Sequence, residues 1–163
     1  MDAFCELYAN KPIERISVQE VANLAGYNRS SFYLHFCDIY ELLDYVESSM
    51  LQTMIQKLDD REGGVQGILS LPTEKSLYLK ALFGDYGSNH FLERLKVNIP
   101  AESHGLGIPE DDPLAPYLME FHLSTVLSLL RLWYQRDSDL PMEELFNLML
   151  CLYTNGINGL SAL

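Results

Sequence analysis

The side chains of this sequence best suited to contact a ligand follow one another closely, in the run NRSSFYLH. Arginine can make a bidentate pair with guanine, and a serine hydroxyl can donate to or accept from any base. Tyrosine and histidine side chains can reach phosphate oxygens. Turned outward together, these side chains would form a surface suited to nucleic acid. The candidate residues are Asn28, Arg29, Ser30, Ser31, Tyr33, Leu34 and His35.

Two short helices are predicted to position this run, and the first of them has clear end signals. Ser17 and Glu20 form a capping box, in which each side chain bonds the backbone N–H of the other residue, so a helix begins at Val18. Gly26 ends that helix, because glycine adopts a positive φ at little cost.

The second helix is predicted to run from Arg29 to Phe36, with Asn28 as its N-cap. Phe32 and Phe36 lie four residues apart and are expected to point inward, which leaves the polar residues of the run outside. Two helices joined by a tight turn indicate a helix-turn-helix, whose second helix enters the DNA major groove. An ordinary helical hairpin within an all-α core would show the same pattern.

This stretch resembles the N-terminal DNA-binding domain of the tetracycline-repressor (TetR) family of bacterial transcription regulators. The resemblance covers roughly residues 1–58 and implies a second helix that reads the operator. By position, it implies that Asn28, Arg29 and Ser30 face bases, while Ser31, Tyr33 and His35 approach bases or phosphates. The residues that carry it are Ser17, Val18, Glu20, Val21, Ala22, Ala25, Gly26, Phe32, Tyr33, His35, Phe36, Leu42 and Leu43.

Two departures from the family pattern weaken the expected grip on phosphate. Ile39 stands where the family often has a phosphate-contacting lysine, and the chain opens directly in the first helix, where the family usually has several more residues. The helix predicted at about 39–58 follows, with Asp38 as its cap. In the family this helix is the lever that transmits ligand binding to the reading helices.

The charge of the chain limits which partners it can bind. The net charge is −12, which argues against a general binder of polyanions. Residues 1–58 hold four basic and eight acidic side chains, a net charge of −4, so few cations are available for DNA. This leaves an alternative, in which a helical protein- or ligand-binding module has kept the fold and lost or weakened its DNA contact.

The remaining sequence predicts a second helical domain. Glycines and charges at 59–67 suggest a boundary, and helices are expected at about 74–84, 89–97, 114–135 and 142–160. The fold class is therefore all-α, with a helix-turn-helix domain at 1–45, the connecting helix at 39–58, and an effector-binding and dimerisation domain at 59–163.

The last two helices carry more apolar surface than one small domain can cover, which favours a two-fold homodimer built on a four-helix bundle. A larger core within one chain is the alternative. The family dimerises in this way. The predicted interface residues are Leu129, Leu132, Trp133, Leu145, Met149, Leu152, Tyr153 and Gly156.

The family also places a small-molecule pocket among these helices, and an apolar or aromatic effector would suit the available lining. Each of these side chains could equally fill an ordinary core. The candidate lining residues are Tyr78, Phe83, Phe91, Tyr117, Phe121 and His122.

Signals for other chemistry are lacking in the sequence. No catalytic or phosphate-loop motif and no metal-ligand spacing of histidines occurs, so we expect neither an enzyme nor a cofactor or metal. Three cysteines without a C-x-x-C pair suggest buried thiols in a reducing cytosol. With no signal peptide and no apolar stretch of about 20 residues, we expect a cytoplasmic protein that contacts no membrane.

Overall fold

The computed structural model describes residues 1–59, 75–98 and 112–155, and every regular element within these ranges is a helix. The predicted all-α class is thus confirmed for the described residues. Most of the predicted boundary at 59–67, and Gly156 with the rest of the last predicted helix, lie outside them.

The first 46 residues, here called the N-terminal head, form three short helices and the start of a fourth. α1 packs against α2, and α2 against α3, as expected for a helix-turn-helix with a supporting first helix. A single 3-10 turn at Ile13–Arg15 follows α1. The helices are α1 (Asp2–Tyr8), α2 (Val18–Leu24) and α3 (Arg29–Tyr33).

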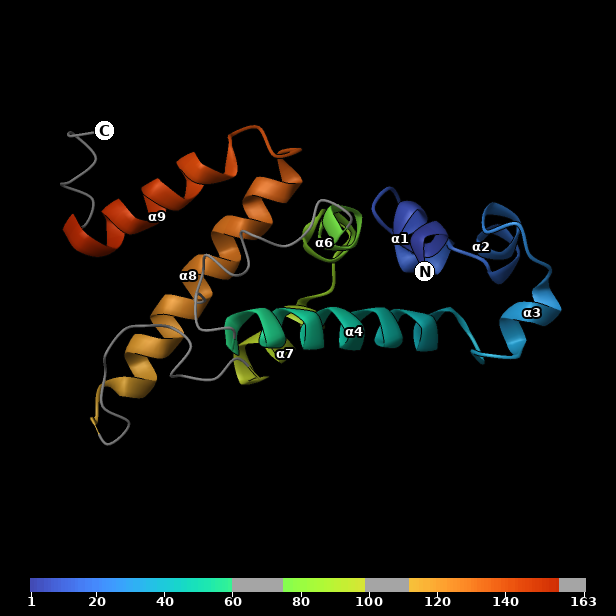
Figure 1. The fold of residues 1–163 in the computed structure, drawn as a ribbon, viewed down its shortest axis with the longest axis horizontal. Coiled ribbons are helices and arrows are strands. Elements are labelled where there is room, and N and C mark those ends of the chain that lie inside the picture. Colours follow the sequence, from blue (N-terminus) through green and yellow to red (C-terminus); the bar gives the residue numbers. More distant parts are fainter. Residues whose placement is uncertain (60–74, 99–111, 156–163) are drawn as a thin grey trace.

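A long helix joins the head to the rest of the chain. α4 (Ile39–Asp59) has 21 residues, which corresponds to about 30 Å at 1.5 Å per residue. Figure 1 shows the head at one end of α4 and the α8–α9 pair at the other, with α6 between α1 and α8. The remaining helices are α6 (Ser76–Phe83), α7 (Asn89–Asn98), α8 (Ala115–Gln135) and α9 (Met142–Asn155).

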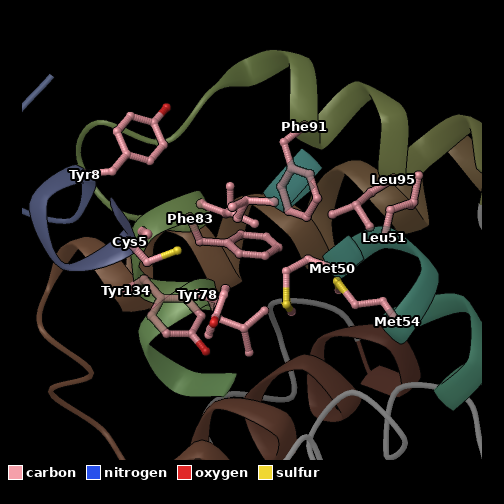
Figure 2. Close-up of a cluster of buried hydrophobic side chains, with 14 of the residues drawn as sticks. Cys5, Tyr8, Met50, Leu51, Met54, Tyr78, Phe83, Phe91, Leu95 and Tyr134 are labelled. Atoms are coloured by element: carbon pink, nitrogen blue, oxygen red, sulfur yellow. The ribbon is translucent and has the colours of Figure 1, made fainter. Parts of the chain in front are cut away.

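One apolar core runs from the head into the second region. Phe83 of α6 lies at its centre, with ring centroids 5.7 Å from Phe91 and 5.8 Å from Tyr134 (Figure 2). Side chains of α1 and α4 join the same cluster, among them Cys5 and Met50. The head is therefore not an independent domain on a linker, because its first helix packs directly on α6.

Two predicted features differ in detail. α3 ends at Tyr33 rather than Phe36, since the chain must turn before α4 begins at Ile39; the N–H groups of His35 and Phe36 both still bond the carbonyl of Phe32. Of the cysteines, Cys5 is buried and Cys151 half-buried, but Cys37 in that turn is exposed, so the expectation of buried thiols was wrong there.

Candidate nucleic-acid interface

The predicted capping box is present at the start of α2. The Glu20 N–H donates to Ser17 Oγ at 3.2 Å, and the Ser17 N–H donates to Glu20 Oε2 at 3.0 Å. Both bonds satisfy backbone donors that the first helical turn would otherwise leave unpaired. The box therefore sets where α2 begins, as the sequence predicted.

The turn between α2 and α3 uses the two residues expected of it. Gly26 has φ +74°, a conformation that L side chains rarely adopt. Asn28 Oδ1 accepts the Ser31 N–H at 3.0 Å and caps α3. The same oxygen accepts the hydroxyls of Ser30 (2.5 Å) and Ser31 (3.2 Å), which leaves the NH₂ group as the part of Asn28 suited to reach a base.

Aromatic packing beneath α3 determines which side of it faces out. Phe32 is buried, and its ring centroid lies 5.6 Å from that of the half-buried Phe36. Phe36 in turn lies 5.5 Å from Tyr45 on α4. This chain of rings attaches the end of α3 to the start of α4.

The predicted reading residues lie outside this aromatic base, with one exception. Leu34 is 80% exposed and Tyr33 48% exposed, while Ser31 is half-buried and its hydroxyl bonds the capping Asn28. Tyr27, which the sequence reasoning missed, is exposed in the turn just before Asn28. Its place directly after the helix-ending glycine was the signal available for it. The predicted residues that are exposed are Asn28, Arg29, Ser30, Tyr33, Leu34 and His35.

Arg29 and Tyr33 form a pair one helical turn apart. Arg29 Nη2 donates to the Tyr33 hydroxyl at 3.0 Å, and the guanidinium carbon lies 5.6 Å from the centroid of the Tyr33 ring. The tyrosine thus holds the guanidinium fork in place at the surface. An arginine already ordered in this way loses less conformational entropy when it pairs with a base.

Several charges near this surface are already engaged. Lys11 Nζ lies 2.7 Å from Glu20 Oε1, and this bond, with those from Ser17, lowers the pKa of Glu20 to about 2. Asp38 accepts the Glu41 N–H at 2.9 Å, and Glu41 accepts the Cys37 N–H at 2.5 Å. The acidic side chains beside α3 therefore serve as helix caps, although their negative charge remains close to any bound phosphate.

Ile39 has a structural role in place of the phosphate contact that its family position suggests. It is buried in the core at the first residue of α4. The next residue, Tyr40, is exposed and offers a hydroxyl at the same end of the helix. An isoleucine here gives up one cation and gains core packing.

The structure separates the six candidate pocket residues. Tyr78, Phe83 and Phe91 are buried in the core of Figure 2, and the Tyr78 hydroxyl bonds Asp2 of α1. Tyr117 and Phe121 are exposed on α8. His122 is buried on α8 with its ring centroid 5.1 Å from that of Tyr153, whose hydroxyl donates to the His122 carbonyl at 3.1 Å.

The candidate interface residues divide as well. Leu145 and Met149 are buried within the chain, whereas Leu132 is exposed. Four more are half-buried: Leu129, Trp133, Leu152 and Tyr153.

The described residues contain no group of three or more His, Cys, Asp or Glu side chains that could hold a metal ion. None of the described helices is both long and apolar enough to cross a bilayer.

Comparison with known proteins adds one finding. Residues 1–46 match the family model described as bacterial regulatory proteins, tetR family. No curated protein and no solved structure matches the chain. The match covers the N-terminal head, where the capping box, the positive-φ glycine and the exposed α3 surface all lie.

Proposed function

We propose that this chain, a TetR-like DNA-binding transcription regulator by its N-terminal head, is a cytoplasmic repressor that a small-molecule effector releases from DNA. The observation that carries the proposal is the exposed row of polar side chains on α3, held outward by the buried Phe32. A helix-turn-helix presents such a row to base edges in the major groove.

Most of the exposed side chains on α3 and at its two ends have a matching chemistry on DNA. The guanidinium of Arg29 suits the O6 and N7 atoms of guanine, and the NH₂ group of Asn28 can donate to a base acceptor. The apolar Leu34 suits the methyl group of thymine. The hydroxyl of Tyr33 and the ring of His35 can contact phosphate oxygens.

A homodimer would bring two such surfaces to successive turns of the duplex, about 34 Å apart. Support comes from α8, which is apolar on two faces. One face is buried within the chain through residues such as Leu123 and Leu130. The other recurs at helical spacing and is exposed at Leu114, Tyr117, Leu118, Phe121 and Leu132.

The effector would bind among the helices that follow α4, and we expect an apolar or aromatic compound. Support comes from the aromatic side chains of α6, α7 and α8 and from the buried imidazole of His122, whose pKa burial lowers. A neutral imidazole beside apolar walls suits a mostly apolar ligand with one polar group.

The test is fluorescence anisotropy with duplexes from the protein's own promoter region at low salt. Arg29→Ala should weaken specific binding by roughly 1–3 kcal/mol, about 5- to 150-fold. Arg15→Ala is the matched control, because Arg15 is an exposed head arginine that belongs to the 3-10 turn and not to α3, and its loss should change affinity less. If the folded wild-type protein binds no palindromic duplex, the proposal fails.

Native mass spectrometry of the purified protein would show whether it is a dimer and whether it retains a small molecule.

A second candidate function is a helical module that no longer binds DNA, and the head's acidic charge and the buried Ile39 favour it. Adding a cation at the start of α4 distinguishes the two. Tyr40→Lys is the suitable variant, because a lysine at the buried position 39 would destabilise the core. A regulator should bind DNA more tightly after this change, whereas the module should still not bind.

A further inference from the structure

One carboxylate lies inside the core where α4 passes α7. Glu47 is 2% exposed and sits on the same side of α4 as Val46 and Met50, which are also buried. A carboxylate in such surroundings is stable only if charged or polar groups replace the water that it has lost.

Those groups come from α7. Arg94 Nη1 lies 3.3 Å from Glu47 Oε2 and 2.8 Å from Asp44 Oδ1, and Arg94 Nη2 donates to Ser48 Oγ at 2.7 Å. His90 Nδ1, one turn before Arg94, lies 3.2 Å from the same Glu47 oxygen. One guanidinium therefore contacts three α4 side chains at spacing i, i+3 and i+4, which form one face of that helix.

This contact is directional in a way that the surrounding packing is not. A guanidinium presents its donors in a planar fork. Rotating α4 by one residue, or sliding it by about 1.5 Å, would remove Glu47 from Arg94 and leave a buried charge unpaired. Met50 and Met54, which pack beside it, are flexible side chains that tolerate such shifts. The ion pair thus adds a direction-dependent contact between α4 and α7 to the apolar packing of the buried Phe91 and Leu95.

The orientation of α4 determines the orientation of α3, because the two helices are attached to each other. Asp38 caps α4 at its first turn, and the ring contact between Phe36 and Tyr45 attaches the end of α3 to it. On its other side the head is held by α1, which packs on α6 and bonds Tyr78 through Asp2. Without the Arg94 contact the head would stay attached through α1 and could pivot about it.

We propose that the Arg94–Glu47 pair is a positioning device, which sets the register of α4 on α7 and through it the separation of the two α3 helices in the dimer. This rests on the proposed function. Arg94 and Glu47 touch no DNA, so they act through α4, and their loss should alter which half-site spacing is preferred rather than contact with each half-site.

The experiment measures spacing preference. A palindromic duplex is selected with the wild-type protein from a randomised library, and its half-site separation is then changed by one and two base pairs each way. Each base pair moves a half-site by about 3.4 Å and a tenth of a turn. The wild-type protein should show one sharp optimum, with about tenfold weaker binding when the spacing differs by two base pairs. For variants that lack the Arg94–Glu47 pair, the same change in spacing should weaken binding by less than about threefold.

The decisive variant is the double change Glu47→Leu with Arg94→Met, because apolar residues of similar volume keep the core filled and leave no buried charge unpaired. Asp44 also loses Arg94, but its side chain is exposed. The single variants Arg94→Met and Glu47→Leu are measured beside it where they fold. Arg94→Lys keeps the charge but not the fork and should restore the optimum only in part.

Lys96→Met is the matched control. The Lys96 side chain also extends from α7, but it pairs at 3.0 Å with the exposed Glu120 of α8. The Lys96→Met variant should therefore keep the wild-type spacing optimum. A double variant with the wild-type optimum would overturn the inference. So would an equal loss of affinity at every spacing, which a merely structural role would produce. If the wild-type protein selects no duplex at all, the proposed function has failed as well, so the two failures are distinguishable.

Discussion

The N-terminal head and the region from α6 to α9 are both helical, but different forces hold their helices. In the head, the starts of α2, α3 and α4 are each capped by the side chain of the preceding residue, Ser17, Asn28 or Asp38. At the starts of α6 and α8 the residues before the helix are Lys75 and Leu114, and neither makes a side-chain cap.

The difference follows from helix length and burial. α2 has seven residues and α3 has five, too few for a helix to be stable alone, so each needs its ends satisfied. α6 has only eight residues but buries five of them, and α8 buries a long apolar face, so the ends of both matter less. Side-chain caps thus mark three helix starts of the head, whereas α6 and α8 depend on burial. The contrast has one exception on each side, since α1 has no side-chain cap and the His90 N–H at the start of α7 donates to Ser88 Oγ at 3.0 Å. Substitutions at the helix ends of the head should therefore have smaller effects than substitutions of buried core side chains.

The largest effect is expected in the shared core. Phe83→Ala removes a buried ring at the centre of the cluster and should lower the free energy of unfolding by about 3–5 kcal/mol. Val97→Ala is the control, because Val97 lies in the same region but is exposed and should change stability by less than about 0.5 kcal/mol. Urea unfolding measures both. Equal losses would contradict the assignment of stability to the buried cluster.

A smaller effect is expected at the turn of the head. Gly26→Ala forces an L side chain into φ +74°, which should cost about 1–2 kcal/mol. No atom lies within 4 Å of the added Cβ, so the cost is backbone strain alone. Gly26→Asn should cost less, because asparagine tolerates this conformation. Thermal unfolding compares the two, and an asparagine variant no better than alanine would show that the strain argument is wrong.

The N-cap of α2 should contribute still less to the free energy of unfolding than Gly26. Ser17→Ala removes the acceptor for the Glu20 N–H and should cost about 1 kcal/mol in the free energy of unfolding. Ser17→Thr keeps a hydroxyl at the same place and should recover most of the loss. Far-UV circular dichroism during urea unfolding provides the measurement. A threonine variant as unstable as the alanine variant would argue against the capping bond.

The smallest effect is expected to be a pH dependence of stability that comes from Glu20 of the same capping box. The Lys11 side chain and the two groups of Ser17 lower the pKa of Glu20 from 4.5 to about 2. Because the folded state favours the ionised carboxylate, its contribution is fully present above about pH 4.5 and is lost as the pH falls toward 2. Wild-type protein should therefore lose more stability over this interval than Glu20→Gln. NMR titration of the Glu20 carboxyl carbon checks the shift directly, and a midpoint near 4.5 would refute it.

Much of the head could be predicted because its determinants act within four residues. The spacing of Ser17 and Glu20, the glycine at position 26 and the caps Asn28 and Asp38 each specify a helix end without reference to the rest of the chain. The end of α3 was predicted three residues too late, since the turn into α4 depends on how Phe36 packs on Tyr45.

Less of the second region could be predicted, although its helices were. Aromatic spacing alone could not separate Phe83, which is buried, from Phe121, which is 62% exposed. Glu47 was missed as a core residue. The available signal was its place beside Val46 and four residues after Leu43, within the apolar stripe of α4. Its partner could not be found that way, because Arg94 lies 47 residues further along the chain.

The sequence by itself determined where α2, α3 and α4 begin and most of the side chains that the α3 surface presents, since short-range hydrogen bonds and helical periodicity suffice for both. The tertiary structure decided which face of α8 is covered, which aromatic side chains fill the core and which cation neutralises Glu47. Those outcomes depend on helices far apart in the chain meeting at a particular angle, and no local pattern encodes that angle.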